Sequence, residues 1–294
     1  MNKEKITYLC AFSSIFFWST SAAAFKIALR SLNYIPLLFY TAVVSFFILC
    51  VSLLFIKKER QEKFFDLKDF FFSALLGFLN PFLYYFILFK AYSLLSGQKA
   101  MALNYTWPLA LTLLSIPLLK QRPSRSVIWG MIVSFLGVLI IANIWDSPWS
   151  LRPQEFFGMT LALSSSFVWG LYWVLNMKDT RDDRVKLCQN FFWGAIYAGI
   201  TLKLNNLPFM IDWKGLLGTL YIGTFEMGIT FILWLKALKF SNNTSQVGRL
   251  IFITPFISLI WISFITGEGI QMTSIVGLCL VVLGIVGPQL MEKK

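Results

Sequence analysis

The sequence predicts an all-α integral membrane protein whose ten transmembrane helices form two inverted-topology repeats of five. Three observations support this fold class. Hydrophobic residues make up 57% of the 294-residue chain and charged residues only 14%, whereas a soluble domain carries about 25% charged residues. The chain divides into ten apolar runs. Its first half also matches its second half at an ordered series of positions.

The apolar runs have the length of membrane spans, since a helix crosses a bilayer core with about 20 apolar residues. In chain order, the predicted spans are 6–29, 36–56, 69–92, 98–119, 125–144, 155–176, 186–204, 215–236, 244–265 and 272–291. Pro81, Pro108, Pro117 and Pro255 lie inside spans, where a helical bundle tolerates the kinks that proline causes. The connections are short, so we expect no soluble domain.

The positive charge of the chain indicates its orientation. There are 26 Lys and Arg against 14 Asp and Glu, a net charge of +12. With the N-terminus inside, 18 of the 26 cations fall in inner loops and termini: Lys3, Lys5, Lys57, Lys58, Arg60, Lys63, Lys68, Lys120, Arg122, Arg125, Lys178, Arg181, Arg184, Lys186, Lys236, Lys239, Lys293 and Lys294. This asymmetry predicts cytoplasmic termini in the cytoplasmic membrane, with the cations against its anionic inner leaflet. Nucleic acid is not needed as a partner to explain the charge.

Several kinds of site are excluded by composition. The chain has no His, so it has no His-ligated metal and no Ser–His–Asp triad. Its four cysteines, Cys10, Cys50, Cys188 and Cys279, are far apart in apolar runs, which excludes a Cys-x-x-Cys site. No P-loop or dinucleotide-binding pattern occurs. We therefore expect no cofactor, no ATP-driven step by this chain alone, and no enzyme activity.

The two halves match at offsets of 146 to 151 residues, close to half of 294. The matches pair Trp18 with Trp169, Asn80 with Glu226, Lys90 with Lys236, Pro108 with Pro255, Gly130 with Gly277 and Gly137 with Gly284. Five helices are an odd number, so the second half would enter the membrane in the opposite direction. We therefore expect repeats at 1–146 and 147–294 with a site between them near the midplane, an architecture common in secondary transporters. The four glycines predict close helix packing, either within the bundle of a monomer or at the seam of a homodimer.

Glu226 is the only acidic residue near the middle of a predicted span. A charge at that depth costs about 2.5–3.5 kcal/mol on insertion scales, so it persists where it is neutral, paired or facing water. The functional interpretation is a ligand for a substrate amine or a proton carrier. The alternative is a structural hydrogen bond between helices. Asn80 occupies the equivalent depth in the first half and is the second candidate.

Arg249 lies near the inner end of the ninth predicted span. It can pair with Glu226 or bind a substrate carboxylate in a bidentate fork. It can equally extend its guanidinium to the inner interface. An Arg and a Glu facing one cavity would suit a zwitterion such as an amino acid.

Aromatic side chains form a further group of candidates, because their faces stack on flat apolar solutes or hold cations. Those expected in the binding site are Trp18, Trp169, Tyr84, Tyr105, Trp107 and Tyr172, with Asn104 as a hydrogen-bonding partner. The alternative for each aromatic is a lipid-facing belt or simple packing.

The chain resembles the drug/metabolite transporter superfamily, and within it the EamA-type transporters. The resemblance rests on the 5+5 arrangement, on the Ser-Ser-x-Phe-x-Trp stretches at 13–18 and 164–169, and on the Gly-x6-Gly helices at 130–137 and 277–284. The stretch 104–108, Asn-Tyr-Thr-Trp-Pro, also looks like the Asn-Tyr-x-Trp-Pro stretch of YddG-like exporters of aromatic amino acids. One departure is Lys120-Gln121, where such repeats often carry Gly-Glu, as at Gly267-Glu268.

The resemblance implies a secondary transporter that moves small amphipathic metabolites such as amino acids outward by alternating access. Proton coupling through Glu226 and facilitated diffusion are both open. The alternative function is uptake of a larger metabolite, such as a nucleoside or an S-adenosylmethionine-like solute. A membrane-embedded enzyme would need a second catalytic group beside the one central acid.

Overall fold

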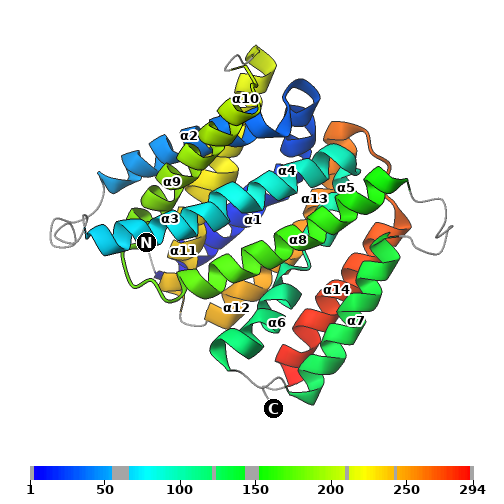
Figure 1. The fold of residues 1–294 in the computed structure, drawn as a ribbon. Coiled ribbons are helices and arrows are strands. Elements are labelled where there is room, and N and C mark those ends of the chain that lie inside the picture. Colours follow the sequence, from blue (N-terminus) through cyan, green and yellow to red (C-terminus); the bar gives the residue numbers. More distant parts are fainter. Residues whose placement is uncertain are drawn as a thin grey trace.

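Figure 1 shows a computed structural model of the protein as a bundle of packed helices. The structure describes residues 3–54, 66–120, 124–142, 152–208, 212–241 and 244–291. Within these ranges every regular element is helical, in agreement with the predicted all-α class. The predicted boundary between the repeats, at residues 146 and 147, lies outside the described residues.

The first half of the chain begins with two long helices and then breaks its third and fourth spans. Its elements are α1 (Lys3–Ser31), α2 (Tyr34–Leu53), α3 (Leu67–Gly77), η2 (Phe78–Leu83), α4 (Tyr84–Leu94), α5 (Gly97–Asn104), α6 (Trp107–Leu119) and α7 (Arg125–Ala142). The side chains of Asn33, Asp66 and Ser96 cap the amide groups at the starts of α2, α3 and α5. Short polar residues favour such starts because they satisfy amides that have no partner in the helix.

The second half repeats this order. Its elements are α8 (Pro153–Asn176), α9 (Asp183–Leu204), α10 (Trp213–Tyr221), η3 (Ile222–Ile229), α11 (Thr230–Phe240), α12 (Thr244–Arg249), η4 (Leu250–Ile253), α13 (Thr254–Thr266) and α14 (Met272–Met291). Asp212 caps α10 as Asp66 caps α3, 146 residues earlier. The two halves therefore share helix starts as well as helix order.

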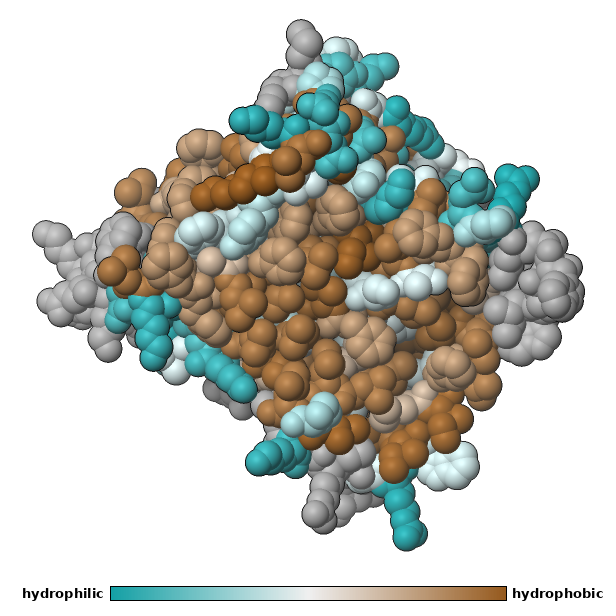
Figure 2. All heavy atoms as spheres, viewed as in Figure 1, coloured by the Kyte–Doolittle hydropathy of each residue, from teal (hydrophilic) through white to brown (hydrophobic). Residues whose placement is uncertain are grey.

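Eight helical stretches of the described chain are long and apolar enough to cross a membrane. They are Lys3–Ser31, Tyr34–Leu53, Leu67–Leu94, Gly97–Leu118, Arg125–Ala142, Pro153–Asn176, Trp213–Phe240 and Val247–Thr266. The other two predicted spans are also helical: α9 starts with several charged residues, and the apolar part of α14 is the shorter stretch Met272–Pro288. Figure 2 shows apolar side chains over most of one face, with hydrophilic ones gathered toward its edges.

Both halves interrupt their third span with a π-helical segment. In the first half η2 contains Asn80, whose backbone is extended (φ −147°, ψ 119°), followed by a cis peptide bond to Pro81. In the second half η3 contains Glu226. A π-helical turn shifts the backbone hydrogen bonds by one residue, and such turns occur frequently at functional sites.

Helices α7 and α14 form a tight antiparallel seam, and they lie side by side in Figure 1. Gly130 lies against the Gly284 carbonyl, and Gly137 against the Gly277 carbonyl, so that an added Cβ would clash at either position. Ser134 donates from its hydroxyl to the Val281 carbonyl at 3.1 Å. The close packing predicted from these glycines thus occurs within the bundle.

Helices α2 and α9 are the second pair of equivalent helices in contact. They too run antiparallel, because Phe46 meets Phe192 at a ring distance of 5.7 Å and the Cys50 and Cys188 sulfurs lie 3.3 Å apart. Cys50 comes later than Phe46, while Cys188 comes earlier than Phe192. Each of these two pairs therefore places a helix of one half against its counterpart in the other half.

Candidate functional site

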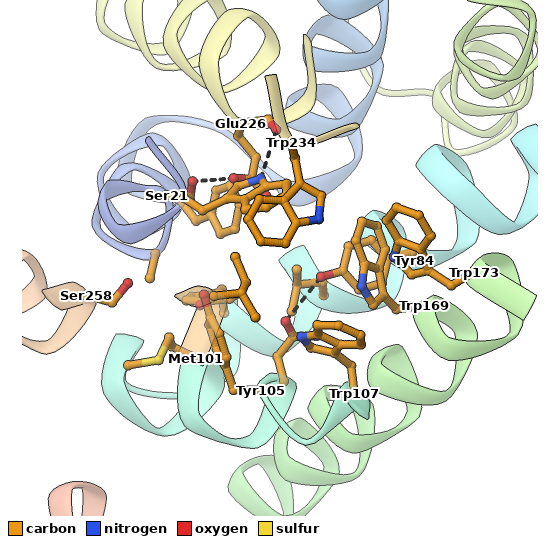
Figure 3. A pocket seen from close by; sticks show the side chains of 17 residues that line it. Ser21, Tyr84, Met101, Tyr105, Trp107, Trp169, Trp173, Glu226, Trp234 and Ser258 are labelled. Carbon is orange, nitrogen blue, oxygen red and sulfur yellow. Dashed lines mark hydrogen bonds between the residues drawn. The ribbon is translucent and has the colours of Figure 1, made fainter. Parts of the chain in front are cut away.

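A cavity of about 90 Å³ lies in the middle of the bundle, between helices of both halves (Figure 3). Its lining residues are Trp18, Ser21, Ala22, Phe25, Tyr84, Leu88, Tyr92, Met101, Asn104, Tyr105, Trp107, Trp169, Trp173, Glu226, Trp234, Ile251 and Ser258. They come from α1, α4, α5, α6, α8, η3, α11, η4 and α13. Seven of the ten predicted binding residues are among them: Glu226, Trp18, Trp169, Tyr84, Asn104, Tyr105 and Trp107.

Glu226 is the one acidic residue in the lining, and its exposed fraction is 8%. Its two carboxylate oxygens accept hydrogen bonds from two hydroxyls, one from Ser21 and one from Tyr85 at 3.1 Å. Its backbone carbonyl accepts from the Trp18 indole at 3.3 Å. Among the described residues, no Lys or Arg lines this cavity. The carboxylate is therefore held by neutral donors and presents an uncompensated acidic group to the cavity.

Aromatic rings surround the space in front of this carboxylate. Trp18 packs edge-on against Trp234, at a ring distance of 5.6 Å. Trp169 packs against the Tyr84 ring at a ring distance of 4.6 Å. Figure 3 shows Glu226 and Ser21 on one side of the space, with Tyr105 and Trp107 opposite. This arrangement presents several ring faces and edges to a solute of modest size.

Asn104 fixes the aromatic wall rather than facing the cavity freely. Its side-chain oxygen accepts from the Tyr84 hydroxyl at 3.1 Å, and its amide nitrogen donates to the Ser165 hydroxyl at 2.9 Å. It is the last residue of α5, where the chain turns before α6 starts at Trp107. The Asn-Tyr-Thr-Trp-Pro stretch thus forms a helix break whose side chains reach the cavity.

Three predicted binding residues do not line the cavity. Asn80 is fully buried near the Tyr172 hydroxyl, which in turn accepts from the Asn190 amide at 3.4 Å. Arg249 ends α12, and Ile251, two residues later, lines the cavity. Arg249 itself is not among the lining residues. The predicted meeting of Arg249 with Glu226 in one cavity is therefore not found, and neither is a direct contact of Asn80 or Tyr172 with it.

Several lining residues were not predicted from the sequence, and Ser21, Phe25 and Trp234 are the most informative of them. A signal for Ser21 and Phe25 was present, because they follow Trp18 at helical spacings of three and seven and so share its face. Trp234 follows Glu226 by eight residues, a spacing that the inserted π-helical turn disturbs.

A family model supports the resemblance noted in the sequence. The model of the EamA-like transporter family matches the chain twice, at residues 5–143 and 156–287. The chain belongs to the EamA-like transporter family. As a member of this family with eight apolar helices long enough to span a membrane, it is a multi-pass membrane protein and not an enzyme. The boundary predicted at 146/147 falls between the two matched segments.

Two curated relatives of this EamA-like protein are named uncharacterized transporters, and a third is named Protein PecM. One from Clostridium kluyveri is 27% identical over 57% of this chain and 55% of its own length, so the match spans about half of that relative. One from Acidianus ambivalens is 29% identical over 70% of this chain and 79% of its own length. Protein PecM of Dickeya dadantii is 24% identical over 69% of this chain and 68% of its own length.

A solved protein crystal structure shares the fold of this EamA-like chain. The two superpose with a TM-score of 0.69, covering 98% of this chain and 97% of the other at 18% identity. At that identity the likeness concerns the fold alone.

Proposed function

We propose that this protein is a secondary transporter that moves small amphipathic solutes outward across the cytoplasmic membrane by alternating access. One observation carries the proposal: a buried carboxylate, Glu226, faces a cavity enclosed by helices of both halves. A buried acid without a cationic partner is costly in a membrane protein and is found mainly on substrate or ion pathways. Family membership supports a transport function. The cavity supports a solute-binding site beside Glu226.

The transporter would consist of two inverted repeats, residues 1–146 and 147–294, with all ten predicted helices crossing the membrane. Two equivalent helix pairs, α7 with α14 and α2 with α9, meet antiparallel, as a two-fold axis in the membrane plane requires. At the α7–α14 seam, Gly130 meets Gly284 and Gly137 meets Gly277, the reciprocal contacts expected of a two-fold axis. Rocking of one repeat against the other would open the cavity to each side in turn.

The termini would be cytoplasmic, because this orientation puts most Lys and Arg on the inner side. Among solutes, the mainly apolar and aromatic lining of the cavity favours small amphipathic ones. For an amino acid, Glu226 would bind the ammonium group. The same carboxylate could couple transport to protons, since protonation would neutralise it and release a cationic group.

Counterflow in proteoliposomes tests this proposal. Vesicles loaded with an unlabelled panel of amino acids and amines are diluted into each labelled compound in turn, and label uptake is measured. We expect uptake above that of empty liposomes for the wild type, loss of that uptake for Glu226→Gln, and wild-type uptake for the matched control Glu4→Gln on the exposed start of α1. Wild-type counterflow by Glu226→Gln would overturn the role of this carboxylate.

A further inference from the structure

We infer that the cavity selects organic monocations: amines that carry a flat apolar group and no carboxylate. The inference rests on the proposed function and narrows its substrate class. The observation behind it is the combination of one carboxylate, a wall of aromatic rings, and no Lys or Arg in the described lining.

The cations of the neighbouring spans are engaged elsewhere. Lys26 donates to the backbone carbonyls of Tyr92 and Leu95 at 3.1 and 2.8 Å. Lys99 pairs with Glu155 at 2.6 Å. Neither is therefore free to bind the carboxylate of a zwitterionic solute, and neither lies in the cavity lining.

Two further basic residues of the spans also stand apart from the cavity. Lys90 lies over the Tyr34 ring at 4.9 Å, and Lys236 lies 5.9 Å from the Phe240 ring. Arg249 is not among the lining residues of the cavity. Among the described lining residues, Glu226 is thus the one Asp, Glu, Lys or Arg that a solute meets in the cavity.

The aromatic wall adds attraction for the same charge. Trp18, Trp169 and Trp234 line the cavity together with Tyr84 and Tyr105. Ring faces attract cations through their quadrupole, most strongly for Trp and in desolvated sites, and such aromatic cages recognise quaternary ammonium groups. The rings also bury the flat apolar part of a solute. The carboxylate and the aromatic rings therefore favour one class of solute, an ammonium compound that carries an aromatic or similar flat apolar group.

A solute carboxylate would be disfavoured in the same space. It would leave water for a wall of rings without a cationic partner, and it would lie close to Glu226. Both effects raise the free energy of a buried anion. An amino acid would gain the ammonium contact but would carry this cost, whereas the matching amine would not.

A matched series of probes tests the inference. Phenethylamine, phenylalanine, 3-phenylpropionate and 2-phenylethanol share one ring and differ in charge. Their binding to the purified full-length protein in detergent is measured by titration calorimetry, with thermal unfolding to verify that each variant is folded. We expect phenethylamine to bind at least tenfold more tightly than the other three. In Glu226→Gln its affinity falls to that of 2-phenylethanol, and Glu226→Asp keeps the preference for the amine.

The outcomes separate this inference from the proposed function. If phenylalanine binds as tightly as phenethylamine, the monocation class is wrong although a solute site exists. If amino acids show Glu226-dependent counterflow while phenethylamine does not bind, the inference again fails and the transporter proposal stands. If no solute shows counterflow or binding to the folded protein, both fail.

Discussion

The two halves place a polar residue at equivalent points of their third spans, yet only one of these residues faces the cavity. Asn80 lies in η2 and Glu226 in η3, 146 residues apart. Glu226 contacts Ser21 of α1 and lines the cavity. Asn80 lies near Tyr172 of α8 and is fully buried.

Two features differ between these positions: Asn80 has an extended backbone whereas η3 continues through Glu226 as a π-helix, and the neighbouring side chains differ in volume. Ser21 and Tyr172 are themselves equivalent positions, each three residues after the matched Trp18 or Trp169. A serine leaves open space beside Glu226, while the tyrosine ring fills the corresponding space beside Asn80. The two halves thus differ here in backbone as well as in the size of the neighbouring side chain, and Glu226 is the one of the two polar residues that lines the cavity.

Replacing Ser21 with tyrosine, the residue at the equivalent position 172, should remove the access that a solute has to Glu226. Ser21→Tyr fills the space beside Glu226, so we expect more than tenfold loss of phenethylamine affinity by calorimetry. The matched control Ser21→Ala keeps the space and removes only the hydrogen bond from Ser21 to Glu226, so we expect its affinity to stay within about fivefold of the wild type, the equivalent of about 1 kcal/mol. Equal affinities for Ser21→Tyr and Ser21→Ala would contradict this account.

The α7–α14 seam is where the halves are most alike, so equivalent glycines should respond alike. Gly130→Ala and Gly277→Ala each put a methyl group against backbone of the other helix. We expect each to lower the free energy of unfolding by about 1–3 kcal/mol, the cost of overpacking a close contact. The control Gly287→Ala, which meets nothing within 4 Å, should be near neutral. Thermal unfolding in detergent measures all three, and a large effect at only one seam position would argue against reciprocal packing.

The loop between α8 and α9 distinguishes the halves by charge. Arg181 pairs with Asp179 and also donates to the Asp69 carbonyl and the Ser73 hydroxyl of α3. The counterpart loop at 31–33 is Ser-Leu-Asn and carries no charge. Partial burial acts to raise the pKa of Asp179, but hydrogen bonds from Arg181 and the nearby positive charges outweigh it and hold this pKa below its ordinary value.

Because the folded state lowers this pKa, the pair stabilises the protein above the unfolded-state pKa of about 3.9 and loses its effect as the pH falls through the lower folded-state value. Asp179→Asn should therefore melt at a lower temperature than the wild type at pH 7, with the gap narrowing below about pH 4. A gap that stays constant down to pH 3 would show that the ion pair does not contribute.

The smallest expected effect concerns the ends of α6 and α13. Lys120 and Gly267, 147 residues apart, both end their helix in the left-handed conformation, with φ of 53° and 78°. A side chain in this conformation costs about 1–2 kcal/mol, partly offset by the extra freedom that glycine has when unfolded. Lys120→Gly should therefore raise stability slightly and Gly267→Ala lower it, as measured by thermal unfolding. The opposite signs would mean that the two ends are not equivalent.

The sequence predicted the helical class, the family and seven of the 17 residues that line the cavity, because these depend on apolar length, on repeated positions and on helical spacing. Glu226, Trp18 and Trp169 were identified in this way. Arg249 was placed by depth alone, and depth does not tell which side of a helix faces the cavity. Lys120 shows the reverse case. It keeps the left-handed backbone conformation of its counterpart Gly267, although the first repeat has no glycine at this position.

Moving the carboxylate from one half to the other tests the central claim most directly. The double variant Asn80→Asp with Glu226→Gln keeps one acid at the equivalent position, and Asn80→Asp alone controls for folding. Calorimetry with phenethylamine should give an affinity for the double variant as low as that of Glu226→Gln, and near wild-type affinity for the single variant. An affinity of the double variant within a few-fold of the wild type would show that either half can supply the carboxylate and would contradict the assignment of recognition to Glu226.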